Sequence, residues 1–123
     1  MVHLALLASL AIAPLSMQTA PLAPAPKVQL SQENAALLRC SAAFALVSFG
    51  QENGNEAALK WPILDPRGQE FFVRSLAKVM DDTGLTRDEV SQMASAEAQR
   101  LLDEEQIDAV MPGCLLMLDV SGV

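Results

Sequence analysis

The two cysteines are the residues of this chain whose chemistry is easiest to specify. Cys40 lies in an apolar stretch, residues 37–47, and Cys114 lies 74 positions later (114 − 40), near the C-terminus. An even number of cysteines in an exported chain favours a disulfide, and two cysteines allow only one intramolecular pairing. We therefore expect a Cys40–Cys114 bond that joins the first helix to the last. The alternatives are two separate buried thiols, or a redox or metal role.

The other side chains offer little for catalysis. The single histidine, His3, lies at the N-terminus and there is no tyrosine, so later segments lack the parts of a Ser-His-Asp or Cys-His site. No Cys-x-x-Cys pair, glycine-rich phosphate loop or dinucleotide fingerprint occurs. Acids at 81–82 and 103–105 could pair, although adjacent acids at helix ends are usually solvated. The sequence predicts a non-enzymatic protein without metal or cofactor, with an enzyme using carboxylates or a serine as the alternative.

The N-terminal segment predicts export. Residues 4–17 are almost entirely apolar, which matches a signal-peptide core and is short for a bilayer span, although no Lys or Arg precedes them. Alternating Ala and Pro follow at 21–26 and favour an extended spacer. We expect a signal peptide at 1–20, a spacer at 21–29 and a helical domain at 30–123. Each candidate cleavage point precedes a proline, so the cleavage site stays open.

This organisation predicts a periplasmic or secreted protein whose mature form has no transmembrane span. An uncleaved membrane anchor and an ordinary cytosolic N-terminus are the alternatives. The net charge is −7, from 15 acidic and 8 basic residues, and all the charged side chains follow the apolar segment. An acidic domain without a basic cluster is a poor candidate for binding nucleic acid or an anionic membrane. We therefore expect an unknown protein or envelope component as the partner and leave the oligomeric state open.

Hydrophobic periodicity predicts a first helix that begins near Ser31, a plausible N-cap, and ends at Gly50. One row of apolar residues recurs at spacings of three and four, and a second row lies beside it. Together the two rows indicate a helix that is almost completely buried. The first row is Leu37, Cys40, Phe44 and Val47, and the second is Leu38, Ala42, Ala45 and Phe49.

Local signals mark the next helices. Asn55 caps a short helix that Pro62 stops, after which Trp61, Ile63 and Leu64 are expected to fold back onto the core. Asp65 followed by Pro66 indicates the start of a longer helix, ending at Gly84. Its expected inner face consists of Phe72, Leu76 and Val79, with Phe71 and Met80 beside them.

A capping box formed by Thr86 and Glu89 begins the following helix. Pro112 and Gly113 favour a break before a last helix that contains Cys114, although helical spacing of apolar residues continues across them. No alternating strand pattern and no repeat occurs. The fold class we predict is all-α: a small bundle of four to five helices stapled by one disulfide.

Two short stretches carry a resemblance to known proteins. Residues 39–45 (RCSAAFA) and 114–119 (CLLMLD) resemble those of small uncharacterised secreted helical proteins of alphaproteobacteria. That resemblance implies a helical periplasmic protein and no known activity. In size, helicity and its single cysteine pair the chain is also similar to the acid-stress periplasmic chaperones of enteric bacteria.

Two functions follow as hypotheses. The first is a non-enzymatic module that binds a protein or an envelope component. The second is a pH- or stress-responsive periplasmic chaperone that exposes apolar helix faces when its carboxylates protonate.

Overall fold

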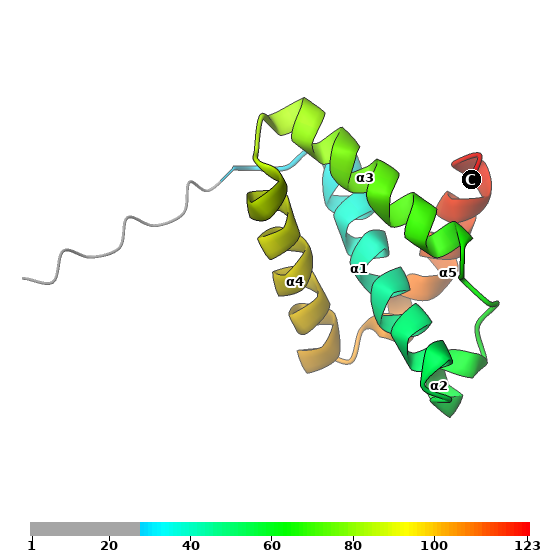
Figure 1. Cartoon of the computed structure of the whole chain (residues 1–123). Coiled ribbons are helices and arrows are strands. Elements are labelled where there is room, and N and C mark those ends of the chain that lie inside the picture. Colours follow the sequence, from blue (N-terminus) through cyan, green and yellow to red (C-terminus); the bar gives the residue numbers. More distant parts are fainter. Residues whose placement is uncertain (1–27) are drawn as a thin grey trace, which may run out of the picture.

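The computed structural model describes residues 28–123, which form five helices and no strand (Figure 1). The predicted all-α class is confirmed, and one of the five helices, Glu56–Leu59, is only a single turn. The predicted signal peptide at 1–20 and all but the end of the spacer lie outside the described residues. The helices are α1 (Gln32–Glu52), α2 (Glu56–Leu59), α3 (Arg67–Thr83), α4 (Arg87–Asp103) and α5 (Ile107–Val120).

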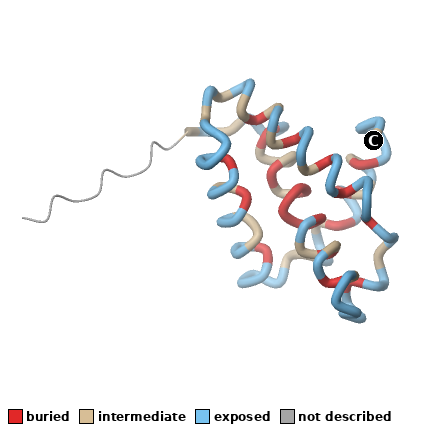
Figure 2. Tube along the Cα trace, in the orientation of Figure 1, coloured by how far each residue is buried: buried red, intermediate tan, exposed pale blue. Residues whose placement is uncertain are grey.

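Helix α1 lies at the centre and contacts each of the other four helices. In Figure 1, α3 and α4 flank it on the near side, α5 lies behind it and α2 turns back at its end. Figure 2 shows buried turns of α1 in the middle of the bundle, whereas the outer faces of the other helices are exposed. The sequence accounts for this, because α1 combines two neighbouring apolar rows with small residues that permit close approach.

The core consists of two groups of apolar side chains. The larger group joins all five helices, and in it the rings of Phe44 and Phe71 meet edge to face with centroids 5.2 Å apart. The smaller group lies where α1, α3 and α4 meet and contains Leu38, Val79, Val90 and Ala94. The main group also includes Cys40, Val47, Leu64, Leu101, Met111, Cys114 and Leu118.

The prediction that Gly50 ends α1 is wrong. The helix continues to Glu52, and Asn53 is its C-cap. Gly50 is buried, and a Cβ on it would lie 2.6 Å from the Cβ of Ala58. Glycine is therefore required here because α2 packs directly against the backbone of α1, and not because of a left-handed conformation.

The second apolar row of α1 is buried over only half its length. Leu38 and Ala42 are buried as predicted, but Ala45 is exposed and Phe49 is 68 % exposed. Only the first part of the row is covered by α3 and α4, so its C-terminal part reaches the surface.

The connection from α1 to α3 depends on one polar side chain that the sequence does not reveal. The amide of Gln51 donates to the carbonyls of Ala58, Trp61 and Pro62 at 3.2, 3.2 and 2.9 Å. Its oxygen accepts from the backbone N–H of Leu64 at 3.1 Å. One side chain thus satisfies four backbone groups of an irregular segment, which would otherwise need water or secondary structure.

Other predictions for this connection have mixed outcomes. Asn55 does cap α2, since its side chain accepts from the N–H of Ala57. Leu64 is buried, but Ile63 is 68 % exposed, contrary to expectation. The predicted Asp65 cap is wrong: α3 begins at Arg67, its N-cap is Pro66, and no side chain caps it. The Gln51 bonds determine the path of the chain here instead.

Helices α3 and α4 keep most of their predicted features. Gly84 ends α3 with a left-handed backbone (φ 73°), and both hydrogen bonds of the Thr86–Glu89 capping box are present. The inner face of α3 is rotated from its expected position, because Phe71 and Val79 are buried while Phe72 is only half-buried.

The predicted break at Pro112 and Gly113 is wrong, because α5 is continuous from Ile107 to Val120. A proline removes one backbone hydrogen bond, but Met111, Cys114 and Leu118 are all buried on one face of this helix. Packing of that shared face keeps the helix intact across the proline.

Two glycine substitutions separate close packing from helix propensity. Gly50→Ala should lower the free energy of unfolding, since the added methyl group clashes with Ala58, whereas Gly113→Ala meets no atom within 4 Å. Alanine is favoured over glycine inside a helix by about 1 kcal/mol, so Gly113→Ala should be stabilising by about that amount. Urea unfolding of both variants measures the difference, and a stabilising Gly50→Ala would contradict the close approach of α2.

Candidate functional site

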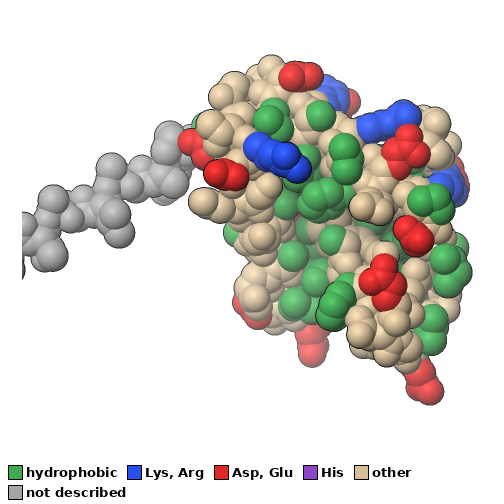
Figure 3. Space-filling view, viewed as in Figure 1, with side chains coloured by type: hydrophobic (Ala, Val, Ile, Leu, Met, Phe, Trp, Pro, Cys, Tyr) green, Lys and Arg blue, Asp and Glu red, His purple; other side chains and the backbone are tan. Residues whose placement is uncertain are grey.

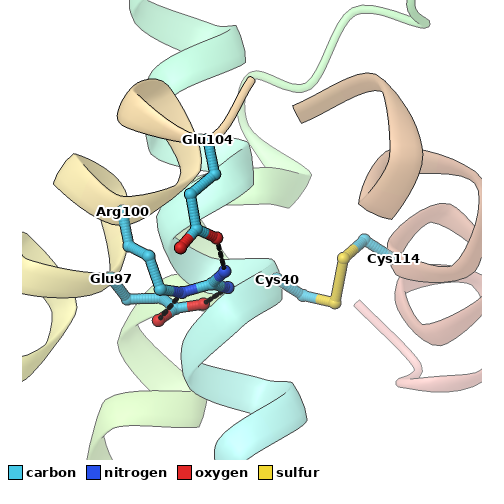
Figure 4. A network of polar contacts seen from close by, with 5 residues as sticks. All are labelled: Cys40, Glu97, Arg100, Glu104 and Cys114. Carbon is cyan, nitrogen blue, oxygen red and sulfur yellow. Dashed lines mark hydrogen bonds and ion pairs between the residues drawn. A yellow bond between two sulfur atoms is a disulfide. The ribbon is translucent and has the colours of Figure 1, made fainter. Parts of the chain in front are cut away.

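The predicted Cys40–Cys114 disulfide is present. The two Cα atoms are 5.2 Å apart, and the cysteines are 3 % and 1 % exposed. Neither cysteine is a free thiol, so the alternative of two separate buried thiols is wrong. The bond joins the middle of α1 to α5 within the main core group (Figure 4).

The candidate carboxylates are engaged separately and do not converge. Asp82 accepts from the ammonium of Lys78 at 2.6 Å and from the buried amide of Asn34 at 3.0 Å. These bonds, the one from Lys78 first, lower the pKa of Asp82, and the same contact raises the pKa of Lys78. Asp103 lies at the far end of α4, where it accepts from Gln99. Asp82 therefore links α1 to α3 and forms no acid pair.

Arg100 holds two further carboxylates on the surface of α4 (Figure 4). Its guanidinium donates to both oxygens of Glu97, at 2.5 and 3.1 Å, and to Glu104 at 2.6 Å. The bonds to Glu97, and then those to Glu104, raise the pKa of Arg100 further above its ordinary value. Both carboxylates thus share one cation, so the cluster of Glu97, Arg100 and Glu104 keeps a net negative charge.

Within residues 28–123, no three His, Cys, Asp or Glu side chains lie close enough together to hold a metal ion. In the same part of the chain, no helix is both long and apolar enough to cross a bilayer. Ser41, a serine beside Cys40 in the sequence, is completely buried in α1 and so is not accessible at the surface.

A surface groove of about 290 Å³ lies between the C-terminal half of α1 and the start of α3. We call it the Phe49 groove. Figure 3 shows apolar side chains across the middle of this face of the molecule, with carboxylates beside them. The side chains that define the groove are Ala45, Ser48, Phe49, Glu52, Asp65 and Phe72.

The Phe49 groove combines an exposed aromatic side chain with free carboxylates. Phe49 is 68 % exposed, and Phe72 is half-buried beside it. Among the interactions of residues 28–123, Glu52 and Asp65 make no ion pair and no side-chain hydrogen bond. An apolar wall with an acidic rim can accept a segment that carries both an apolar and a basic side chain.

Sequence reasoning missed this groove because it placed Phe49 in the core. Phe49 follows Phe44 by five residues, which turns it by about 140° around a helix, so it cannot share the face of Phe44. This angular offset was the signal that could have identified Phe49 as exposed. The acidic residues that line the groove, Glu52 and Asp65, were a second signal.

No protein-family model matches this chain, and searches of curated proteins and of solved structures also find no match. The structure itself therefore defines the class: an all-α domain whose first and last helices are joined by a disulfide.

Replacement of both cysteines by alanine tests the contribution of the disulfide. Closing a loop of about 75 residues constrains the unfolded chain by about 4.5 kcal/mol in the entropic model, and measured values are typically about 2–4 kcal/mol. We expect the Cys40→Ala/Cys114→Ala variant to lose an amount in this range, measured by urea unfolding. Reductant should destabilise the parent and leave the variant unchanged. A variant as stable as the oxidised parent would contradict this role.

Proposed function

We propose that this chain is an exported, non-enzymatic helical domain that binds a segment of a partner protein in the Phe49 groove. The observation that carries the proposal is the exposed ring of Phe49 beside two carboxylates, Glu52 and Asp65, that have no cationic partner among residues 28–123. Aromatic anchors surrounded by a polar rim are typical of protein–protein interfaces.

The chemistry of the groove favours a particular kind of segment. Burying a phenylalanine side chain contributes about 1.5–3 kcal/mol, so an apolar side chain of the partner that covers Phe49 supplies the main driving force. The free carboxylates favour Lys or Arg next to that apolar residue, and the net charge of −7 attracts basic partners from a distance. We therefore expect a partner segment that places apolar and basic side chains together.

Export to the periplasm or the extracellular space forms part of the proposal. Disulfides persist in oxidising compartments and are rare in the cytosol, so the Cys40–Cys114 bond supports it. The resemblance to secreted helical proteins of alphaproteobacteria and the predicted signal peptide at 1–20 lead to the same location.

Selection of displayed peptides on the oxidised full chain tests the binding function. We expect enrichment of peptides that combine aromatic or aliphatic residues with Lys or Arg, and loss of that enrichment with Phe49→Ser. Leu116→Ser is a matched control, because Leu116 on α5 is also 68 % exposed. Charge reversal at Glu52 and Asp65 should shift the enrichment towards acidic peptides. Enrichment that is absent, or equal for Phe49→Ser and the parent, would contradict the proposal.

A second candidate, an acid-responsive chaperone, is favoured by the links between the helices. Three of these links use carboxylates: Asp82 with Asn34 joins α1 and α3, Lys60 with Asp108 joins the end of α2 to α5, and Arg67 with Asp119 joins α3 to α5. Protonation of these carboxylates removes the charge from each link. The disulfide would keep the loosened helices together while apolar faces become exposed.

Asp82 provides the test of this candidate. Because its folded pKa is lowered, its contribution is fully present above the unfolded value of about 3.9 and is lost as the pH falls through the folded value. The stability difference between the parent and Asp82→Asn should therefore shrink as the pH falls below about 4. Lys78, Asn34 and the nearby Glu33 and Asp81 are the groups that surround this link.

The chaperone candidate also requires a gain of apolar surface in acid. The parent should bind a hydrophobic dye and suppress client aggregation below about pH 4, and Asp82→Asn should begin to bind dye at a higher pH. Asp81→Asn, which alters the neighbouring exposed acid, should behave as the parent does. If the parent neither binds dye nor protects a client in acid, this candidate fails.

A further inference from the structure

Arg39 stands apart from the other cations of this acidic chain. Residues 28–123 contain seven Lys and Arg side chains, since Lys27 is the only one of the eight outside them. Five of these seven form ion pairs with carboxylates, and the other two are Arg39 and Arg87. Arg87 is exposed at the start of α4, whereas Arg39 is half-buried in the middle of α1. Its guanidinium forms no ion pair in the described part of the chain.

Arg39 lies between two grooves with apolar walls. One groove, of about 490 Å³, runs between α1 and α4, and Leu30, Leu38 and Met93 contribute apolar side chains to it. The other, of about 350 Å³, lies between α1 and α5 beside the disulfide, where Val110 and Met117 contribute. Arg39 belongs to both linings. Arg39 thus lies between apolar side chains of α4 on one side and of α5 on the other.

The acidic side chain that lines the α1–α4 groove forms no ion pair with Arg39. Glu97 lines the α1–α4 groove, but Arg100 holds both of its oxygens and also holds Glu104. In Figure 4 this cluster lies on the α4 side of α1, and the side chain of Cys40 points the other way, towards α5. The charge of Arg39 consequently remains available to an anion that enters the groove.

We propose that the groove between α1 and α4 binds an aliphatic carboxylate, with Arg39 bound to the carboxylate and Leu38 and Met93 in contact with the chain. A guanidinium binds a carboxylate through two parallel hydrogen bonds, and the groove volume is in the range of small-molecule sites, about 300–1,000 Å³. This site is separate from the Phe49 groove and does not depend on the proposed protein partner.

A free amphiphile fits this groove better than a peptide or a membrane surface. Leu30, Leu38 and Met93 offer no hydrogen bonds, so the backbone groups of a peptide would be left without partners there. The net charge of −7 opposes approach to an anionic membrane. An aliphatic chain with one carboxylate avoids the first cost, because only its head group is polar, and it reduces the second to the repulsion of a single charge.

Titration of the oxidised full chain with decanoate, below its micelle concentration, tests the proposal by calorimetry. Arg39→Met retains an apolar stem and removes the charge, so it should weaken decanoate binding about tenfold or more, a factor that corresponds to about 1.4 kcal/mol. Arg87→Met is the matched control and should bind as the parent does. Binding of 1-decanol, which has no charge, should be equal for the parent and Arg39→Met.

The proposal is overturned if the parent does not bind decanoate at millimolar concentrations, or if Arg39→Met binds it as tightly as the parent. Should Arg39→Met fail to fold, magnetisation transfer between the Met93 methyl group and the decanoate chain in the parent decides the question. Such transfer is the expected result, and its absence when decanoate is bound would place the ligand elsewhere and overturn the proposal.

Discussion

The bond between Cys40 and Cys114 is the interaction on which the arrangement of the helices depends. Helix α5 is attached to the core through three buried side chains, Met111, Cys114 and Leu118, and the central one is covalently joined to α1. Because α1 contacts every other helix, a bond to its middle fixes α5 relative to the whole bundle. A domain of fewer than one hundred residues has a limited core, so a constraint on the unfolded chain contributes a large share of its net stability.

Features that depend on local sequence were predictable. The Thr86–Glu89 capping box, the Asn55 cap and the left-handed Gly84 are all determined by interactions between residues close in the chain. The cysteine pairing was also predictable, because two cysteines leave one choice. The predictions that failed depend on neighbours distant in sequence. Gly50 is required by the approach of Ala58, and α5 passes through Pro112 because its buried face holds it in place.

The candidate sites were harder to predict than the fold for the same reason. Periodicity places Phe49 near an apolar face of α1, but only the arrangement of α3 and α4 determines that this end of the helix is left uncovered. Likewise, the sequence shows Arg39 inside an apolar helix, yet its lack of an ion pair among residues 28–123 becomes evident only when the positions of Glu97 and Arg100 are known. Helix α1 thus contributes to the core, to the disulfide and to both proposed binding surfaces.

The most direct test of this account is the intact mass of the protein, purified without reductant, after alkylation with and without prior reduction. We predict that neither cysteine is alkylated before reduction and that both are alkylated after it, in a chain shortened at its N-terminus near residue 20. Alkylation of both thiols without reduction would contradict the claim that the Cys40–Cys114 bond joins α1 to α5.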